Sequence, residues 1–383
     1  MLSEGIKMKK NILFITLLLS VSLVLGCSNG KNTASSKKNN KEASSAVTIS
    51  NSSVSTENPE TSDAPTTAST YTIKDFYPFN ANAKYVYEGK GLEYSSNITY
   101  VDYIKNNRIQ LRINNGGTEL VKIIENKDGA LKLVYLKEET YYREDLTSKQ
   151  SNTKEEILLK EPLVKGTSWT LPNGDKRYIS NTDISITTPS GKYKTIEVTT
   201  EDKGGNTKDY YALNTGLVKT VFSNNSMEIT SSLKQISNNS PFTQTIKFYY
   251  PNINGDKFYF IKRNISFNTN DITKLQFEKY FKEAPSKDST KLLGQNTKIK
   301  SLYLNKDNIV YIDFSKDLVS EMNVGASFEE EILQCITNTV GTYYGASKVY
   351  ITIEGNPYSS GHIVMNKGET FSVNTKNSIE ISK

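Results

Sequence analysis

Residues 298–318 read KIKSLYLNKDNIVYIDFSKDL, and this stretch decides the fold of the C-terminal part of the chain. Apolar and polar residues alternate over 299–304, a polar turn occupies 305–308, and 309–314 is apolar on both faces. Two such runs joined by a short turn predict a β-hairpin. A strand that is apolar on both faces belongs inside a sheet rather than at its edge.

The hydrophobic period changes after the hairpin. From Phe328 to Val340, apolar side chains recur at intervals of three and four residues, which predicts a helix with one buried stripe. We expect Ser327 to cap this helix, because its hydroxyl can accept a bond from the first turn. The acidic residues 329–331 are expected to form a solvated first turn, where the helix dipole favours negative charge. A further strand is predicted over 349–353.

These elements together resemble the GerMN domain of sporulation and germination proteins. The resemblance covers about residues 243–375 and rests on five segments. They are KFYYPNINGDKFYF at 247–260, the helix before LLGQNTKIKSLYL at 292–304, VYIDFSKDL at 310–318, the helix through ITNTV at 336–340, and VYITIEGNP at 349–357. The resemblance implies an interaction module that packs against copies of itself or against a channel partner.

The same region is predicted to be a small α+β domain with the element order ββαββαβ. Its helices are expected over 271–281 and 328–341, packed on one face of a sheet. Asp271 and Pro285 bracket the first helix, as start and stop signals do.

We expect a secretory signal at the beginning of the chain. Lysines precede an apolar run, 12–25, that is too short to cross a membrane comfortably. The run ends in VLGC, which is similar to a lipobox, so residues 1–26 are expected to be removed and Cys27 to become lipid-modified. The alternative is an ordinary cysteine in a secretory signal. Acyl chains on Cys27 would hold the protein on the extracytoplasmic face of the cell membrane.

A tether and two folded parts are predicted to follow. Residues 27–70 are rich in Ser, Thr, Asn and Lys and bury too little apolar surface to offset the entropy of ordering, so we expect a disordered segment. An antiparallel β-domain is expected over 71–240, and the GerMN domain over 241–383. The polar stretch 238–241 marks the predicted border.

Short β-runs separated by turns make up the predicted β-domain. NNGG at 114–117 and NKDG at 126–129 are strong hairpin turns, and consecutive hairpins predict an antiparallel meander, as a curved sheet or half-barrel. GTSW at 166–169, TPSGKY at 188–193 and YALNTGLVK at 211–219 resemble segments of an antiparallel β-domain found in extracellular bacterial lipoproteins. A concave sheet of this kind would offer an apolar face to a lipid or another hydrophobic ligand.

Few side chains suit catalysis. His362 is the only histidine, which excludes a zinc site of two or more histidines. Ser359 and Ser360 lie near it in a turn without a nucleophile-elbow signature, so we expect His362 to make a local hydrogen bond. Cys335 falls on an apolar helical stripe, and Trp169 is the only tryptophan; both are expected to be core residues. We therefore expect no enzymatic activity and no catalytic, cofactor-binding or metal-binding residue.

Composition narrows the class of partner. The net charge of +6 is modest and spread along the chain, without a nucleic-acid motif, so a nucleic-acid partner is not expected. The 24 tyrosines suit stacking on glycans, but strand propensity explains them equally well. The sequence favours a non-enzymatic lipoprotein that acts as a scaffold, through contacts with sporulation channel or envelope proteins or with itself. The alternative is a binding lipoprotein whose β-domain holds a hydrophobic or glycan ligand.

Overall fold

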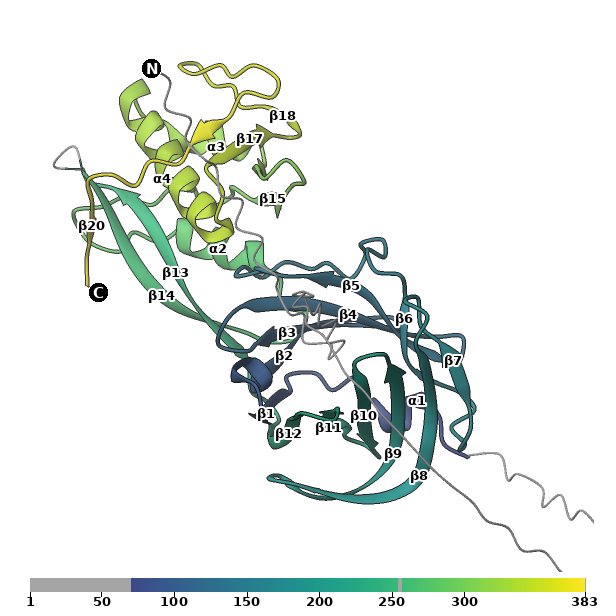
Figure 1. Ribbon diagram of the computed structural model, residues 1–383. Helices are drawn as coiled ribbons and strands as arrows, with labels where there is room; N and C mark the ends of the chain where they lie inside the picture. Colours follow the sequence, from purple (N-terminus) through teal and green to yellow (C-terminus); the bar gives the residue numbers. More distant parts are fainter. Residues whose placement is uncertain (1–69, 254–256, 383) are drawn as a thin grey trace, which may run out of the picture.

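The computed structural model describes residues 70–253 and 257–382. Cys27, the predicted signal and the predicted tether therefore lie outside the described residues. Figure 1 shows a strongly curved β-domain in blue to teal and a C-terminal domain in green to yellow. Within the described ranges, no helix is both long enough and apolar enough to cross a bilayer.

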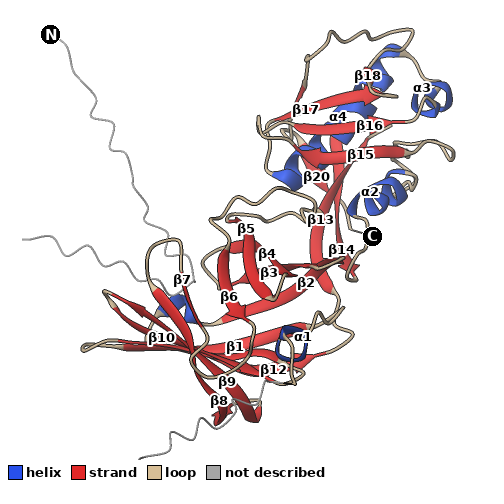
Figure 2. Cartoon of the chain, turned by 90° about the vertical axis from the view of Figure 1, so that its right-hand side faces the viewer, coloured by secondary structure: helices blue, strands red, loops and turns tan. Residues whose placement is uncertain are grey.

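A single antiparallel sheet of 12 strands forms the β-domain, in the order β6-β5-β4-β3-β2-β1-β12-β11-β10-β9-β8-β7. Two meanders, β1 to β6 and β7 to β12, are joined by the pairing of β1 with β12 (Figure 2). This arrangement confirms the predicted curved meander. The strands are β1 (Lys84–Lys90), β2 (Asn97–Lys105), β3 (Arg108–Asn114), β4 (Glu119–Lys127), β5 (Ala130–Lys137), β6 (Glu156–Lys160), β7 (Ser168–Thr170), β8 (Lys176–Thr188), β9 (Gly191–Asp202), β10 (Gly205–Ala212), β11 (Gly216–Ser223) and β12 (Glu228–Ser237).

Side chains bridge the two edges of this sheet and nearly close it into a barrel. The indole N–H of Trp169 donates to the carbonyl of Ile157 at 3.0 Å, and Arg177 donates to the same carbonyl at 2.8 Å. Trp169 is 7% exposed and packs in the core of the β-domain, as expected from the sequence. The short helix α1 (Ile73–Phe76) also buries its two apolar residues in this core. A 3-10 turn, η1 (Glu93–Ser95), follows β1.

The C-terminal domain follows the predicted order ββαββαβ up to β17, with one additional short helix, α3, and three further short strands after β17. Strand β16 lies between β15 and β17, as its two apolar faces indicated, and the turn at 305–308 closes the hairpin between β15 and β16. The elements are β13 (Phe242–Pro251), β14 (Phe258–Phe267), α2 (Thr273–Phe281), β15 (Ile299–Leu304), β16 (Val310–Phe314), α3 (Asp317–Met322), α4 (Ala326–Tyr344), β17 (Lys348–Ile353), β18 (Asn356–Pro357), β19 (Phe371–Ser372) and β20 (Ser378–Glu380).

The strands of this domain are divided between two sheets, which the sequence did not indicate. One sheet contains β13, β14 and β20, and the other contains β15 to β18, with β19 paired to β17. Helix α4 contacts β13 as well as β16 and β17. Phe277 of α2 packs on Phe248 of β13, with ring centroids 5.5 Å apart. The helices therefore share one apolar core with both sheets.

Both long helices begin at residues other than those predicted. Helix α4 begins at Ala326 after Gly325, so Ser327 lies in its first turn and is not the cap. Helix α2 begins at Thr273, and the Asp271 carboxylate accepts the backbone N–H of Asn268 at 2.8 Å instead of capping the helix. The observed N-cap residues are Gly325 for α4 and Ile272 for α2, and neither helix has a side-chain hydrogen bond at its cap.

A buried arginine connects the two domains. The guanidinium of Arg143 donates to the carbonyl of Asp102 at 2.8 Å and to the hydroxyl of Tyr103 at 2.7 Å, both in the β-domain. It also donates to the carbonyl of Asn268 at 3.0 Å and the hydroxyl of Thr273 at 3.2 Å, in the C-terminal domain. Because these bonds lie out of water, they fix the position of one domain on the other.

Candidate ligand-binding cavity

The interior of the curved sheet contains a cavity of about 430 Å³. Its volume falls within the range of small-molecule sites in proteins. The two walls of the cavity come from the two meanders of the β-domain, and they differ in chemistry.

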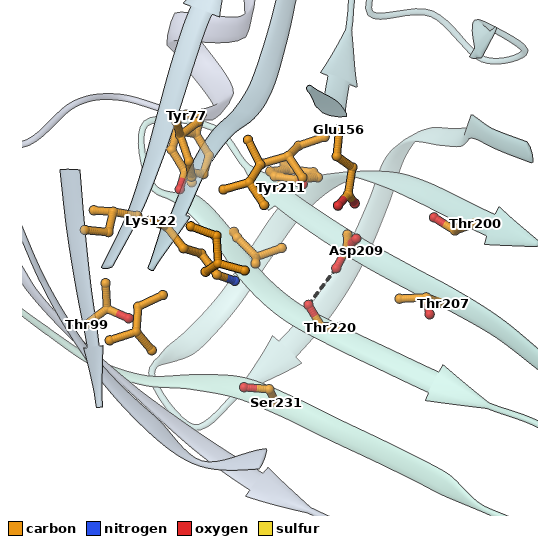
Figure 3. A pocket seen from close by; sticks show the side chains of 18 of the residues that line it. Tyr77, Thr99, Lys122, Glu156, Thr200, Thr207, Asp209, Tyr211, Thr220 and Ser231 are labelled. Carbon is orange, nitrogen blue, oxygen red and sulfur yellow. Dashed lines mark hydrogen bonds between the residues drawn. The ribbon is translucent and has the colours of Figure 1, made fainter. Parts of the chain in front are cut away.

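Apolar side chains form the first wall. Alternation along β3 and β4 directs every second residue inward, a register shift between β4 and β5 interrupts it on β5, and the inward positions of the three strands are aliphatic except for Lys122. These residues are Ile109, Leu111, Ile113, Leu120, Ile124, Leu133 and Leu136. The same wall carries one ionisable side chain, Lys122 of β4, whose ammonium points into the cavity toward Thr220 and Asp209 (Figure 3).

Hydroxyl and carboxylate groups form the second wall. The strand register places Thr200 of β9 opposite Thr207 of β10, and Thr220 of β11 opposite both Asp209 of β10 and Ser231 of β12. Figure 3 shows these side chains along neighbouring strands, with the hydroxyl of Thr220 donating to Asp209 at 2.6 Å. The wall is therefore a surface of hydrogen-bonding groups facing the aliphatic wall.

An ion pair lies beside this polar wall. Arg177 of β8 binds Glu156 of β6 at 3.0 Å and donates to the hydroxyl of Thr200 at 2.6 Å. The pair links the two edges of the sheet at the same place as the Trp169 bond described above. It therefore both closes the sheet and contributes polar groups to the cavity.

Burial changes the pKa of the two ionisable groups that face each other. Desolvation lowers the pKa of the Lys122 ammonium, and the carboxylates of Glu156 and Asp209 partly offset this. Desolvation raises the pKa of Asp209, partly offset by the guanidinium of Arg177 and the Thr220 bond. Ionisable groups that lie in a cleft and whose pKa values are shifted by burial are found at functional sites more often than groups with ordinary pKa values.

The loop that contains His362 is attached to helix α4 through Glu329. Glu329 is 4% exposed, so the expected solvated helix start is wrong for this residue. Its carboxylate accepts bonds from Tyr358 at 2.8 Å and from Ser360 at 2.5 Å, and it pairs with Nδ1 of His362 at 2.9 Å. Burial raises the pKa of Glu329, but these bonds outweigh it and the net pKa is lowered. The hydroxyl of Ser360 binds the carboxylate and not the imidazole, so the geometry lacks a serine–histidine nucleophile pair.

The remaining predicted residues are placed as follows. Cys335 is fully buried on α4, and burial raises the pKa of its thiol well above the ordinary value. In the part of the chain that the structure describes, no group of three His, Cys, Asp or Glu side chains is arranged to hold a metal ion.

The sequence did not identify the cavity residues Lys122, Glu156, Arg177 and Asp209. A signal was present in β10, where Tyr210 and Ala212 are apolar and pack on the outer face with Val218. Thr207 and Asp209, which alternate with these outward residues along the strand, therefore face the inside of the curved sheet. Alternation alone does not say which face of a strand is the concave one, so the sequence pattern does not place these residues in a cavity.

A comparison with protein families gives a match within the C-terminal domain. Residues 247–359 match the Germane family, which is described as sporulation and spore germination. This match confirms the GerMN resemblance that the sequence segments indicated. No curated protein matches the chain.

Solved structures with similarity to parts of the chain come from several bacteria. The tandem GerMN domains of the sporulation protein GerM from Bacillus subtilis are 20% identical, and the match covers 30% of this chain and 41% of that chain, with a TM-score of 0.24. A protein described as a lipoprotein from Clostridium perfringens is 19% identical over 34% of this chain and 87% of that chain, with a TM-score of 0.23. A protein described as exported, with a YmcC-like fold, from Bacteroides fragilis is 12% identical over 42% of this chain and 98% of that chain, with a TM-score of 0.27.

Proposed function

We propose that this protein is a non-enzymatic, membrane-anchored binding lipoprotein whose β-domain holds a hydrophobic or amphipathic small molecule. The observation that carries the proposal is the cavity of about 430 Å³, with an aliphatic wall on β3 to β5 and a hydrogen-bonding wall on β9 to β12. A cavity that is apolar on one side and has a few convergent polar groups is the usual form of a small-molecule site.

The remaining features agree with this role. The match of residues 247–359 to a family described as sporulation and spore germination supports a role in one of those processes. The lipobox-like sequence ending at Cys27 supports attachment to the extracytoplasmic face of the membrane. A tethered β-domain there would collect a ligand close to the membrane, and the C-terminal domain would place it near envelope partners.

The scaffold role is the second candidate, and one observation on the C-terminal domain favours it. Ile272 and Leu275, at the start of α2, are 54% and 48% exposed. Neighbouring exposed apolar side chains suit a protein contact. In-cell crosslinking of Leu275→Glu against wild type, in sporulating cultures, tests this candidate. Loss of a crosslinked envelope protein in the variant alone would support it.

The binding role is tested by identifying what occupies the cavity. The full-length chain is purified from its own membranes, denatured, and its released small molecules are identified by mass spectrometry. The comparison is Ile113→Trp, which fills the cavity from the aliphatic wall. The matched control is Lys194→Trp, the introduction of the same side chain at a strand position that is 78% exposed.

The two variants separate the outcomes. A compound that is recovered with wild type and Lys194→Trp, and lost with Ile113→Trp, would support ligand binding in the cavity. Equal recovery from all three proteins, at the level of the surrounding membrane lipid, would refute it.

A further inference from the structure

The charged side chains inside the cavity balance one another. Lys122 and Arg177 are positive, and Glu156 and Asp209 are negative. Arg177 is paired with Glu156, and Lys122 interacts with both carboxylates. Moving a proton from Lys122 to Asp209 would leave the total charge of these groups unchanged. A charged group on a ligand would therefore enter without a counter-charge, and an uncompensated charge is costly in such a site.

Charges farther out in the cavity act against an anion. Lys154, Asp175 and Asp202 lie near strand ends or in loops that line the cavity. They add one positive and two negative side chains, and this excess of negative charge disfavours a carboxylate or phosphate group.

The hydroxyl wall indicates which polar groups are suited to the cavity instead. Thr207 and Thr220 lie on neighbouring strands, and Ser231 lies opposite Thr220. A hydroxyl both donates and accepts hydrogen bonds. The Thr220 hydroxyl donates to Asp209 and so keeps only its capacity to accept. The wall therefore matches ligand groups that donate as well as accept, such as hydroxyls, and the aliphatic wall across the cavity matches an alkyl chain.

We infer that the cavity takes an uncharged amphiphile, an alkyl chain with a hydroxyl-bearing head such as a monoacylglycerol, in preference to a fatty acid or another anionic lipid. This inference rests on the proposed function, since it names the class of ligand for the same site. The alkyl chain lies against the aliphatic residues of β3 to β5. The head lies against Thr207, Asp209 and Thr220.

A matched pair of photoreactive probes tests the preference. Both carry the same alkyl chain with a diazirine; one ends in a glycerol ester and the other in a carboxylate. Each is added at neutral pH to membranes that contain the full-length protein, and labelled peptides are identified by mass spectrometry. Cavity binding is the labelling of β3 to β5 and β9 to β12 in the wild-type protein minus the labelling of the same strands in Ile113→Trp. This subtraction removes labelling by probe that is dissolved in the membrane.

We expect the glycerol probe to label the cavity at least about tenfold more strongly than the carboxylate probe. The free-energy cost of burying one uncompensated charge is larger than the free-energy difference that corresponds to a tenfold ratio of affinities. Among the four inner groups, Asp209→Asn leaves one positive charge in excess, and we expect it to reverse the preference. The double variant Lys122→Met with Asp209→Asn restores the balance and should restore the preference for glycerol. A variant that merely misfolds would lose both probes and could not show this reversal and recovery.

The outcomes distinguish this inference from the function it rests on. Stronger or equal labelling by the carboxylate probe in wild type would overturn the inference and leave ligand binding intact. An unchanged preference in Asp209→Asn would also overturn it, because the charge balance would then not set the choice. If neither probe labels the cavity above the Ile113→Trp level, the proposed function fails as well.

Discussion

Replacing Arg143 with methionine should loosen the connection between the two domains. Methionine keeps much of the aliphatic length of arginine but removes every donor. Arg143 is 0% exposed, and its guanidinium carbon lies 4.2 Å from the centre of the Tyr103 ring. Its loss would leave the carbonyls of Asn268 and Asp271, among others, without this donor.

The cost follows from these contacts. Removing one partner from a buried ionic network costs about 3–5 kcal/mol. The carboxylate of Asp102 retains Arg112, 2.9 Å away, so it is not left as a lone charge. We therefore expect a value near the lower limit, about 3 kcal/mol, which is a large share of a typical unfolding free energy.

The chain has one natural reporter in each domain for this measurement. Trp169, the only tryptophan, reports on the β-domain by fluorescence, and the buried Cys335 reports on the C-terminal domain by thiol labelling read on its own peptide. In wild type, both reporters should give the same urea midpoint. In Arg143→Met, the midpoints should separate, because the domains no longer stabilise each other.

The matched control is Arg108→Met. Arg108 binds Glu125 at 2.9 Å and the carbonyls of Thr147 and Lys149, all within the β-domain. Its replacement should shift the midpoints without separating them. Coincident midpoints in Arg143→Met, with a loss below about 1 kcal/mol, would refute the assigned role of the buried guanidinium.

Three further predictions concern other positions. The folded protein lowers the pKa of Glu329 from 4.5, so the carboxylate stabilises the fold above that pH and this stabilisation is lost as the pH falls. Glu329→Gln should therefore weaken the dependence of the urea midpoint on acid pH. An unchanged dependence would contradict the role assigned to Glu329. Gly91→Ala should destabilise the pairing of β1 with β12 by roughly 1–3 kcal/mol, because the added Cβ would lie 2.1 Å from the carbonyl oxygen of Glu228. A melting temperature equal to that of wild type would argue against this steric conflict. Trp169→Phe should cost up to about 1 kcal/mol beyond its change in packing, because the carbonyl of Ile157 loses one of its two donors and keeps Arg177. Circular dichroism during urea unfolding measures this, and a neutral effect would count against a contribution of the indole bond to bridging the edges.

The sequence predicted those elements in which the hydrophobic period is regular and the turn residues are characteristic. The hairpin at 299–314, the helix of α4 and the antiparallel meander all follow from local alternation and turn residues. The division of the C-terminal strands between two sheets depends on contacts between distant segments, such as Phe248 with Phe277, and local pattern carries no information about these.

The candidate site was less predictable for a related reason. Lys122 and Asp209 lie on different meanders, and only the curvature of the sheet brings them to one cavity. Glu329 was expected in solvent because acidic residues are common in a first helical turn. Its hydrogen-bond partners come from a loop about 30 residues later in the chain. A buried carboxylate needs such partners, and the sequence does not show which distant residues supply them.

The pairing of β1 with β12 also sets the order in which the β-domain can fold as the chain emerges during synthesis. Hairpins β2 to β6 are local and can form early, but Lys84 of β1 lies opposite Ser237 of β12, so one edge of β1 stays open until nearly the whole domain is available. An open strand edge is a template for aggregation. Since β13 begins soon after β12, at Phe242, the edge is covered only once the chain has been made up to the start of the C-terminal domain or beyond it.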